Sequence, residues 1–455
     1  MNPYTLVVRG DVVTSDGILD DMKVAVRNGI VVALHMGHEY LDAEECIDAR
    51  GKLIFPGIID AHVHCYSYEG EGVSNATRSA IAGGVTTIVD MPFDAGEPVT
   101  TDAILRRKIM TVNEESINDV ALLGTISKDG DTTELSAMVD DGICGLKLSL
   151  TESDPRRFPR ISDAILQDVL PLFAPYGLPV GFHAENDEII RHNTETAKLS
   201  GKHGIEQHGA TRPPISEYLE IAKLLEFAVC SGIPLHLNHL TLPHSVEMAT
   251  RYKKAGCDIT TETCPHYLLL DEQDMFRLGM RSKINPPLRG DGARDGLWKC
   301  LLNGEIDILA SDHAPWPLSR KASEDVFANA SGSPSVETFF PLMFSEAVVR
   351  RGAHPSLLVR HMVEKPARRF CLESRKGRLM PGMDADMTIL DPSISWTIHA
   401  DELFAAADWT PFEGVHVQGK VVSTISRGRL FYNGKNVLGR PGDGCFLPAT
   451  CKRKG

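Results

Sequence analysis

The sequence predicts an α/β protein, with a TIM (β/α)8 barrel in the middle of the chain and a small β-sandwich domain built from both chain ends. Through the middle, short apolar runs alternate with longer helical patterns, which is typical of a parallel sheet. Both ends instead carry strand-like runs separated by turn signals. With 455 residues, the chain is long enough for a barrel and a second small domain.

The barrel is predicted from eight short apolar runs, each followed by a stretch with helical patterning. The candidate strands are Ile54 to His62, Thr86 to Met91, Val120 to Gly124, Gly145 to Leu150, Pro179 to His183, Pro234 to His239, Asp258 to Thr263 and Ile306 to Ser311. In residues 216–230, for example, Tyr218, Ile221 and Leu225 fall on one helical face. Eight such units fit a TIM barrel, and an open doubly wound sheet is the alternative arrangement.

The chain ends carry hairpin signals. Asn28-Gly29 separates two apolar runs, and Asn433-Gly434 repeats this signal near the C-terminus. We therefore expect both ends to build one domain around a central insert. The expected division is residues 1–52 for the N-terminal part of the sandwich, residues 53–380 for the catalytic barrel, and residues 381–455 for the C-terminal part of the sandwich and a tail.

Composition limits the classes of partner. The apolar fraction of 42% and the charged fraction of 24% are those of a globular protein. A net charge of −14 argues against nucleic acid, because binding phosphates needs clustered basic residues. We expect no membrane partner, since no apolar run approaches about 20 residues. The N-terminus does not read as a signal peptide, and ten cysteines without CxxC spacing read as reduced thiols. Together these features predict a cytoplasmic protein.

Polar residues gather where the candidate strands end. His62 and His64 are two residues apart on one strand, so both imidazoles can reach one metal ion. The other candidates are Lys147, His183, His239 and Asp312. A lone buried histidine is usually a hydrogen-bonded core residue, and an aspartate after a strand often caps a helix. Barrel enzymes, however, place their chemistry at these strand ends, so six such residues together predict a metal site.

Several motifs follow one another along nearly the whole chain. They are Phe55 to His64, Gly83 to Thr87, Gly145 to Lys147, His183 to Asn186, Pro286 to Arg289, Ser311 to His313 and Gly382 to Asp386. As a set, these motifs resemble those of the cyclic amidohydrolases of the amidohydrolase superfamily. That group comprises hydantoinases, dihydropyrimidinases, allantoinases and dihydroorotases.

The resemblance implies a site for two divalent metal ions, most commonly zinc. In this family, a lysine carries a carboxylate derived from carbon dioxide and bridges the two ions, which assigns that role to Lys147. A lysine in an apolar strand is otherwise costly, and carboxylation turns it into an anionic ligand. The resemblance further assigns His62, His64 and Asp312 to one ion. It assigns His183 and His239 to the other.

The resemblance also implies the reaction. A hydroxide shared by two ions forms near neutral pH and attacks the ring carbonyl of a cyclic amide. Asp312 then acts as the catalytic base and acid, taking the proton of the attacking water and passing it to the departing ring nitrogen. The alternative is that Asp312 is a ligand only. Family members are usually homo-tetramers or homo-dimers, which is the expectation for this chain.

The identity of the ring is predicted less directly. Four residues are expected to contact it: Asn285, Tyr66, Asp94 and Ser333. Tyr66 stands where dihydroorotases have an arginine that pairs with the substrate carboxylate, and a phenol cannot form this pair. Glu152 replaces the tyrosine of dihydropyrimidinases and D-hydantoinases, which favours a rearranged loop. Asp94 replaces an asparagine of allantoinases. The resulting order is allantoin or a substituted hydantoin, then a dihydropyrimidine, then dihydroorotate.

Residues beside the ligands have two possible roles. Glu185 and Asn186 follow His183, and they can support that ligand or cap a loop. His236 is expected to be structural. His266 is expected to pack or to support a ligand.

Two other classes of protein remain possible. Collapsin response mediator proteins are non-catalytic scaffolds that share this fold but have lost metal ligands. All six ligand positions are present here, which favours catalysis. A hydrolase of linear amides or esters on the same scaffold is the second alternative.

Overall fold

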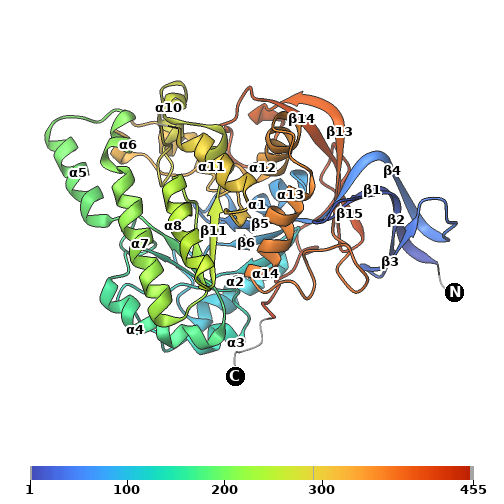
Figure 1. Cartoon of the computed structure of the whole chain (residues 1–455), viewed down its shortest axis with the longest axis horizontal. Helices are drawn as coiled ribbons and strands as arrows, with labels where there is room; N and C mark the ends of the chain where they lie inside the picture. Colours follow the sequence, from blue (N-terminus) through green and yellow to red (C-terminus); the bar gives the residue numbers. More distant parts are fainter. Residues whose placement is uncertain (1–2, 291, 451–455) are drawn as a thin grey trace.

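The computed structural model describes residues 3–290 and 292–450. The strands of the two chain ends lie together at one side of the molecule, and the helices of the middle surround an interior sheet (Figure 1). No helix among the described residues is both long enough and apolar enough to cross a membrane. Cys371 is disulfide-bonded, so the prediction that all ten cysteines are reduced is wrong for this residue.

A single seven-stranded sheet contains strands from both chain ends, in the order β15-β14-β13-β4-β1-β2-β3. Its strands are β1 (Tyr4–Val13), β2 (Ile18–Arg27), β3 (Ile30–Met36), β4 (Ala43–Pro56), β13 (Met387–Thr397), β14 (His416–Ser426) and β15 (Arg429–Tyr432). The two ends meet where β4 pairs with β13 in antiparallel register. Asn28 and Gly29 both have positive φ and join β2 to β3, as the hairpin signal predicts. The exact division into residues 1–52, 53–380 and 381–455 stays a prediction.

The middle of the chain forms parallel strands in two groups, β5-β6-β7 and β12-β11-β10-β9-β8. Their bounds are β5 (Ile58–Val63), β6 (Val85–Asp90), β7 (Asp119–Leu122), β8 (Leu146–Ser149), β9 (Val180–His183), β10 (Leu235–Leu237), β11 (Ile259–Thr263) and β12 (Ile308–Leu309). Parallel bridges between Gly124 and Leu146, and between Val63 and His313, join the two groups at both edges. The eight strands therefore close into the predicted barrel.

Helices follow the strands and cover the outside of the barrel (Figure 1). They are α1 (Gly72–Ala82), α2 (Asp102–Glu115), α3 (Leu135–Asp140), α4 (Asp163–Phe173), α5 (Asp187–Leu199), α6 (Glu206–Thr211), α7 (Pro214–Ser231), α8 (Pro243–Lys254), α9 (Pro265–Leu269), α10 (Glu272–Leu278), α11 (Ala293–Leu302), α12 (Val336–Met343), α13 (Ser356–Val359) and α14 (Lys365–Arg369). In α7, Ile221, Leu225 and Ala228 are buried, whereas Tyr218 is only partly covered. The predicted apolar face of α7 is thus turned inward.

A buried ion cluster links the barrel to the seven-stranded sheet. Nζ of Lys376 lies 2.6 Å from Asp119 at the start of β7, and 2.8 and 2.6 Å from Asp384 and Asp386, which precede β13. Burial disfavours the ammonium charge, but Asp386 and the other two carboxylates raise the pKa of Lys376 above its usual value. The lysine thereby reduces the repulsion among three acidic groups, two of which also pair with Arg375 and Arg427.

We predict that Lys376→Met destabilises the protein by about 3–5 kcal/mol, because it leaves buried carboxylates uncompensated. Without the ammonium, the folded state holds protons on these carboxylates at higher pH than the unfolded state does. Stability should then fall as pH rises, so the deficit should be larger at pH 8 than at pH 5. Urea unfolding at both pH values measures it, with the exposed Lys435→Met as the control. Equal stability of the two variants would contradict the proposed role of the cluster.

Candidate metal centre

All six predicted ligands lie at or just beyond the carboxyl ends of barrel strands. They line one cavity of about 730 Å³, and they are His62, His64, Lys147, His183, His239 and Asp312. The first four lie in or directly after β5, β8 and β9, whereas His239 and Asp312 follow the ends of β10 and β12. Both of these later residues have positive φ, 38° and 49°, which is uncommon for residues other than glycine. The backbone therefore leaves the strand direction at these two ligands, and the predicted strands are too long there.

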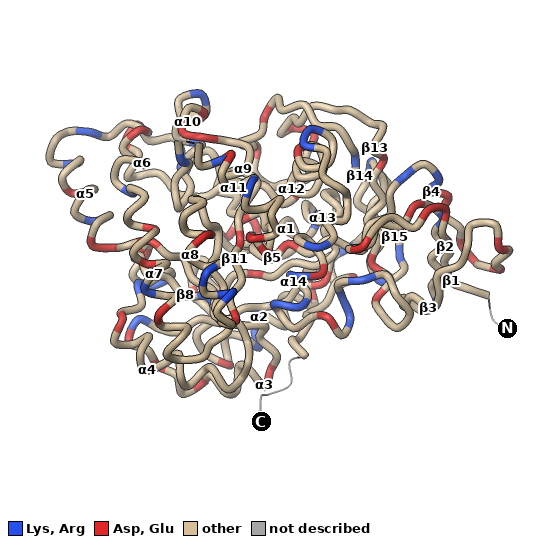
Figure 2. Tube along the Cα trace, viewed as in Figure 1, with Lys and Arg blue, Asp and Glu red and all other residues tan. Residues whose placement is uncertain are grey.

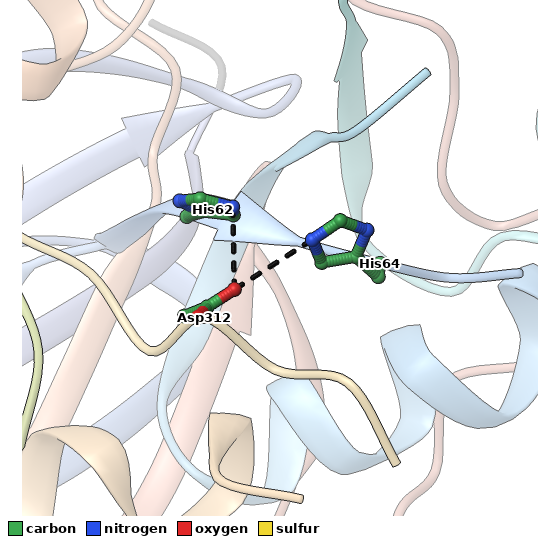
Figure 3. A group of neighbouring side chains, drawn as sticks. All are labelled: His62, His64 and Asp312. Carbon is green, nitrogen blue, oxygen red and sulfur yellow. Dashed lines mark ion pairs between the residues drawn. The ribbon is translucent and has the colours of Figure 1, made fainter. Parts of the chain in front are cut away.

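His62, His64 and Asp312 converge on one point (Figure 3). Oδ1 of Asp312 lies 3.2 Å from Nε2 of His62 and 3.6 Å from Nε2 of His64. The segment after β12 lies beside the end of β5, where the backbone N–H of His64 donates to the carbonyl of His313 over 2.8 Å. This pairing brings Asp312 close to the two histidines. The three side chains offer ligand atoms that all lie within 4.8 Å of one another. This arrangement suits a single metal ion.

His183 and His239 form a second group. Nδ1 of His183 lies 3.1 Å from Nε2 of His239, and Nε2 of His183 donates to Glu185 over 2.8 Å. Burial lowers the pKa of His183, and it lowers the pKa of His239 well below its usual value. Both imidazoles are consequently neutral near pH 7, as a metal ligand must be.

Lys147 is a buried lysine whose Nζ has no hydrogen-bond partner among the described residues. Burial lowers its pKa to about 8, against the opposing charges of Glu262 and Asp312. An amine with this pKa is partly uncharged near neutral pH and can react with carbon dioxide. The orphaned nitrogen and the donors around it fit a carboxylated lysine that binds metal.

Glu262 is hydrogen-bonded to two of the predicted metal ligands. Its carboxylate accepts hydrogen bonds from Nδ1 of His62 over 2.8 Å, from Nε2 of His236 over 3.1 Å and from the backbone N–H of His239 over 3.1 Å. Burial opposes its ionisation, but His62 and His236 lower the pKa of Glu262 below its usual range. Glu262 thus fixes the tautomer of one ligand and the backbone of another. It was not predicted from the sequence, although it explains why His236 is structural.

The sequence left two roles open for Glu185 and Asn186, which were support of His183 or capping of a loop. The structure assigns one role to each. Glu185 accepts from His183 and forms an ion pair with Arg212, so it supports the ligand. Asn186 caps α5, with its side-chain oxygen accepting from the backbone N–H of Ile189 over 3.0 Å. His266 is buried beside Asp312, and neither of its ring nitrogens has a hydrogen-bond partner in the described part of the chain.

The four predicted substrate contacts lie in different surroundings. Asn285 lines the cavity, and its Oδ1 is buried without a partner among the described residues. Tyr66, Asp94 and Ser333 are not among the described residues that line the cavity. Asp94 instead forms a 2.8 Å ion pair with Lys108, and burial raises the pKa of Asp94 to about 6. Contacts from these last three residues stay predictions, and the ion pair gives Asp94 another role.

Glu152 does line the cavity, but it forms an ion pair with Lys128. This pairing turns its charge toward a cation of the preceding loop. The charge of Glu152, which stands where dihydropyrimidinases have a tyrosine, is thus balanced by Lys128.

Fold and site together define a barrel protein with a metal-binding cluster at the carboxyl ends of its strands. A family model described as "Amidohydrolase family" matches residues 53–431, and the chain belongs to this family, whose members depend on metal. It is 33% identical over 446 residues to the allantoinase of Solibacter usitatus, covering 97% of this chain and 96% of that protein. It is 33% identical over 402 residues to the allantoinase of Deinococcus radiodurans, covering 88% and 89%.

A solved structure gives the same result. The L-hydantoinase (dihydropyrimidinase) from Arthrobacter aurescens superimposes with a TM-score of 0.94 and 31% identity, covering 98% of this chain and all of that one. These relatives confirm the resemblance to the cyclic amidohydrolases that the motifs predicted. They also confirm the fold class.

We predict that Glu262→Gln weakens metal retention by about 10- to 100-fold, because the amide cannot hold His62 and the backbone of His239 as the carboxylate does. Competition with a chelator, followed by metal analysis of the protein, measures the change. The exposed Glu247→Gln on α8 serves as the matched control. Metal retention equal to that of the wild type would show that Glu262 does not support the site.

Proposed function

We propose that the protein hydrolyses the ring amide of a cyclic ureide, with allantoin or a substituted hydantoin as the preferred ring. The observation that carries this proposal is the set of six donor side chains around one cavity, among them a buried lysine whose amine has no partner among the described residues. Relatives named allantoinase and L-hydantoinase support the choice of ring. A non-catalytic scaffold of this fold would be expected to lack some of these donors.

The donor set fits two divalent ions. His62, His64 and Asp312 would hold one, His183 and His239 the other, and a carboxylated Lys147 would hold both. Imidazole and carboxylate donors suit zinc, which we infer to be the resident metal. When bound, this centre supplies a nucleophile generated from water near neutral pH and a Lewis acid for the carbonyl oxygen.

The protein's own groups position the ring and move the proton. His62 and His64 lower the pKa of Asp312 to about 2 although burial opposes this, so its carboxylate is ionised at neutral pH. Asp312 also faces the cavity, which lets Oδ1 or Oδ2 accept a proton and return it to the departing ring nitrogen. Asn285, whose Oδ1 has no partner in the described part of the chain, is placed to accept a hydrogen bond from a ring N–H.

The proposal includes the oligomeric state and the location of the protein. We infer a homo-tetramer or homo-dimer in the cytoplasm, on the strength of the family resemblance. A dihydropyrimidinase-type or dihydroorotase-like activity is the alternative within the same chemistry.

A substrate screen tests the proposed reaction. Zinc-loaded protein should open the rings of allantoin and 5-substituted hydantoins with a higher kcat/KM than that for dihydrouracil or dihydroorotate. Linear amides and esters of similar size should react far more slowly, because they lack the ring that the cavity positions. Chromatography of the ring-opened ureido acids provides the measurement. Preference for linear amides would contradict the proposal.

Lys147→Ala should remove both the bridging ligand and most of the activity. The loss of about 4 kcal/mol of transition-state stabilisation corresponds to a decrease in kcat/KM on the order of 1000-fold. Metal content should fall as well, and added formate or propionate should restore part of both by placing a carboxylate in the vacated space. The exposed Lys202→Ala is the control. Full activity of Lys147→Ala would disprove the role of Lys147.

A further inference from the structure

The cavity above the metal ligands has a cationic wall. Besides Lys147, the basic residues that line it are Arg157, Arg191, Lys198, Lys283 and Arg320, together with Arg212, which is already paired with Glu185. The chain as a whole has a net charge of −14, and acidic residues are interspersed with basic ones along its outer helices (Figure 2). The charge of this wall is therefore opposite to that of the chain, which indicates an anionic ligand.

The acidic residues of the cavity do not neutralise this wall. Glu152 is paired with Lys128, outside the cavity. Asp154 accepts hydrogen bonds from two backbone N–H groups of its own loop, both over 2.9 Å. Asp187 accepts from the backbone N–H of Glu152 over 3.0 Å. Three of the four carboxylates outside the metal site are thus already engaged, and the fourth is the exposed Glu195.

Two of the cations share one aromatic ring. Cζ of Arg157 lies 5.6 Å from the ring centroid of Trp316, and Cζ of Arg320 lies 5.0 Å from it. Within the described residues, neither guanidinium forms an ion pair with a carboxylate. An anion bound beside this indole would offset the repulsion between the two like charges.

Arg157 is held in place by backbone groups. Its Nε donates to the carbonyl of Phe93, and its Nη2 donates to the carbonyl of Tyr66 over 3.3 Å. These bonds leave Nη1 available to a ligand. Burial lowers the pKa of Arg157, and the charge of Arg320 lowers it further, although Asp94 and Asp154 oppose this effect.

Arg157 lies close to the reacting centre. Its charge acts on His64, and both residues line the cavity together with Trp316. The next residue, Phe158, has its ring centroid 6.0 Å from that of His183. A group bound to Arg157 would therefore leave an attached ring within reach of the metal ligands.

We propose that the substrate is a cyclic ureide with an ionised carboxylate on a short ring substituent, and that this carboxylate binds between Arg157 and Arg320 beside Trp316. The inference rests on the proposed function and adds the substrate class. A guanidinium binds a carboxylate through two parallel hydrogen bonds, which fixes orientation as well as charge. Of the two rings proposed above, this favours a hydantoin with an anionic substituent over allantoin, whose ureido group is neutral and cannot pair with Arg157.

The test compares two matched rings, hydantoin-5-acetic acid and the neutral hydantoin-5-acetamide. Zinc-loaded wild-type protein should open the acid with a kcat/KM at least about 10-fold higher. Arg157→Gln should lower kcat/KM for the acid by about 10- to 100-fold, mainly through KM, because a charged hydrogen bond is lost. The amide should change by less than about 2-fold, since it makes no ion pair. Arg320→Gln should reduce the same preference.

Controls separate a binding role from a folding defect. Arg156→Gln changes an exposed neighbour on the same loop and should leave both rings unaffected. Arg157→Lys keeps the charge and should retain part of the preference for the acid. Circular dichroism and zinc content of all variants should match those of the wild type, which ties any change to the missing guanidinium.

Calorimetric titration of both rings provides a readout that does not need turnover. Equal hydrolysis and equal binding of the acid and the amide would overturn the inference while the proposed function stands. Binding of the acid that depends on Arg157, without ring opening by zinc-loaded protein, would overturn the proposed function while the anion site stands. Preference for the acid that persists in both Arg157→Gln and Arg320→Gln would also overturn the inference.

Discussion

The site depends on one hydrogen-bonded seam at which the barrel closes. His64 donates to the carbonyl of His313 over 2.8 Å, and the N–H of His313 donates back to the carbonyl of His62 over 3.3 Å. This pairing brings the last barrel strand beside the first, so that Asp312 faces two histidines from the opposite end of the barrel sequence. The positive φ of Asp312 then turns its carboxylate into the cavity. Closure of the barrel therefore places Asp312 beside His62 and His64.

Buried lysines elsewhere in the molecule show why Lys147 is unusual. Lys108 lies 2.8 Å from both Asp90 and Asp94, and these charges raise its pKa although burial opposes them. Lys321, which is also buried, donates to the carbonyl of Lys283 over 2.8 Å. In contrast, Nζ of Lys147 has no such partner among the described residues. Since the other buried lysines that the structure describes have partners, the unsatisfied amine of Lys147 favours a functional role for this residue.

The strand-borne part of the site could be predicted from sequence, because the register of a strand determines which side chains face the same way. The loop-borne part could not. Asp94 forms an ion pair with Lys108 of α2, and no local sequence pattern predicts this pair. Glu262 lies in a strand among threonines, so its role appears only when β5 and β11 are brought together. Arg157 lies in an irregular loop, and only the folded structure shows that it forms no ion pair with any described acidic residue.

The cationic wall has an energetic consequence that bears on catalysis. The partly buried guanidinium of Arg157 forms no ion pair within the described residues, and an anionic substrate would relieve the cost of its burial on binding. The substituent lies away from the bond that breaks, so Arg157 would stabilise the ground state and the transition state about equally. Such uniform binding lowers KM without raising kcat. On this proposal, rate enhancement would come from the predicted metal ligands at the strand ends, and selection among rings from the loops.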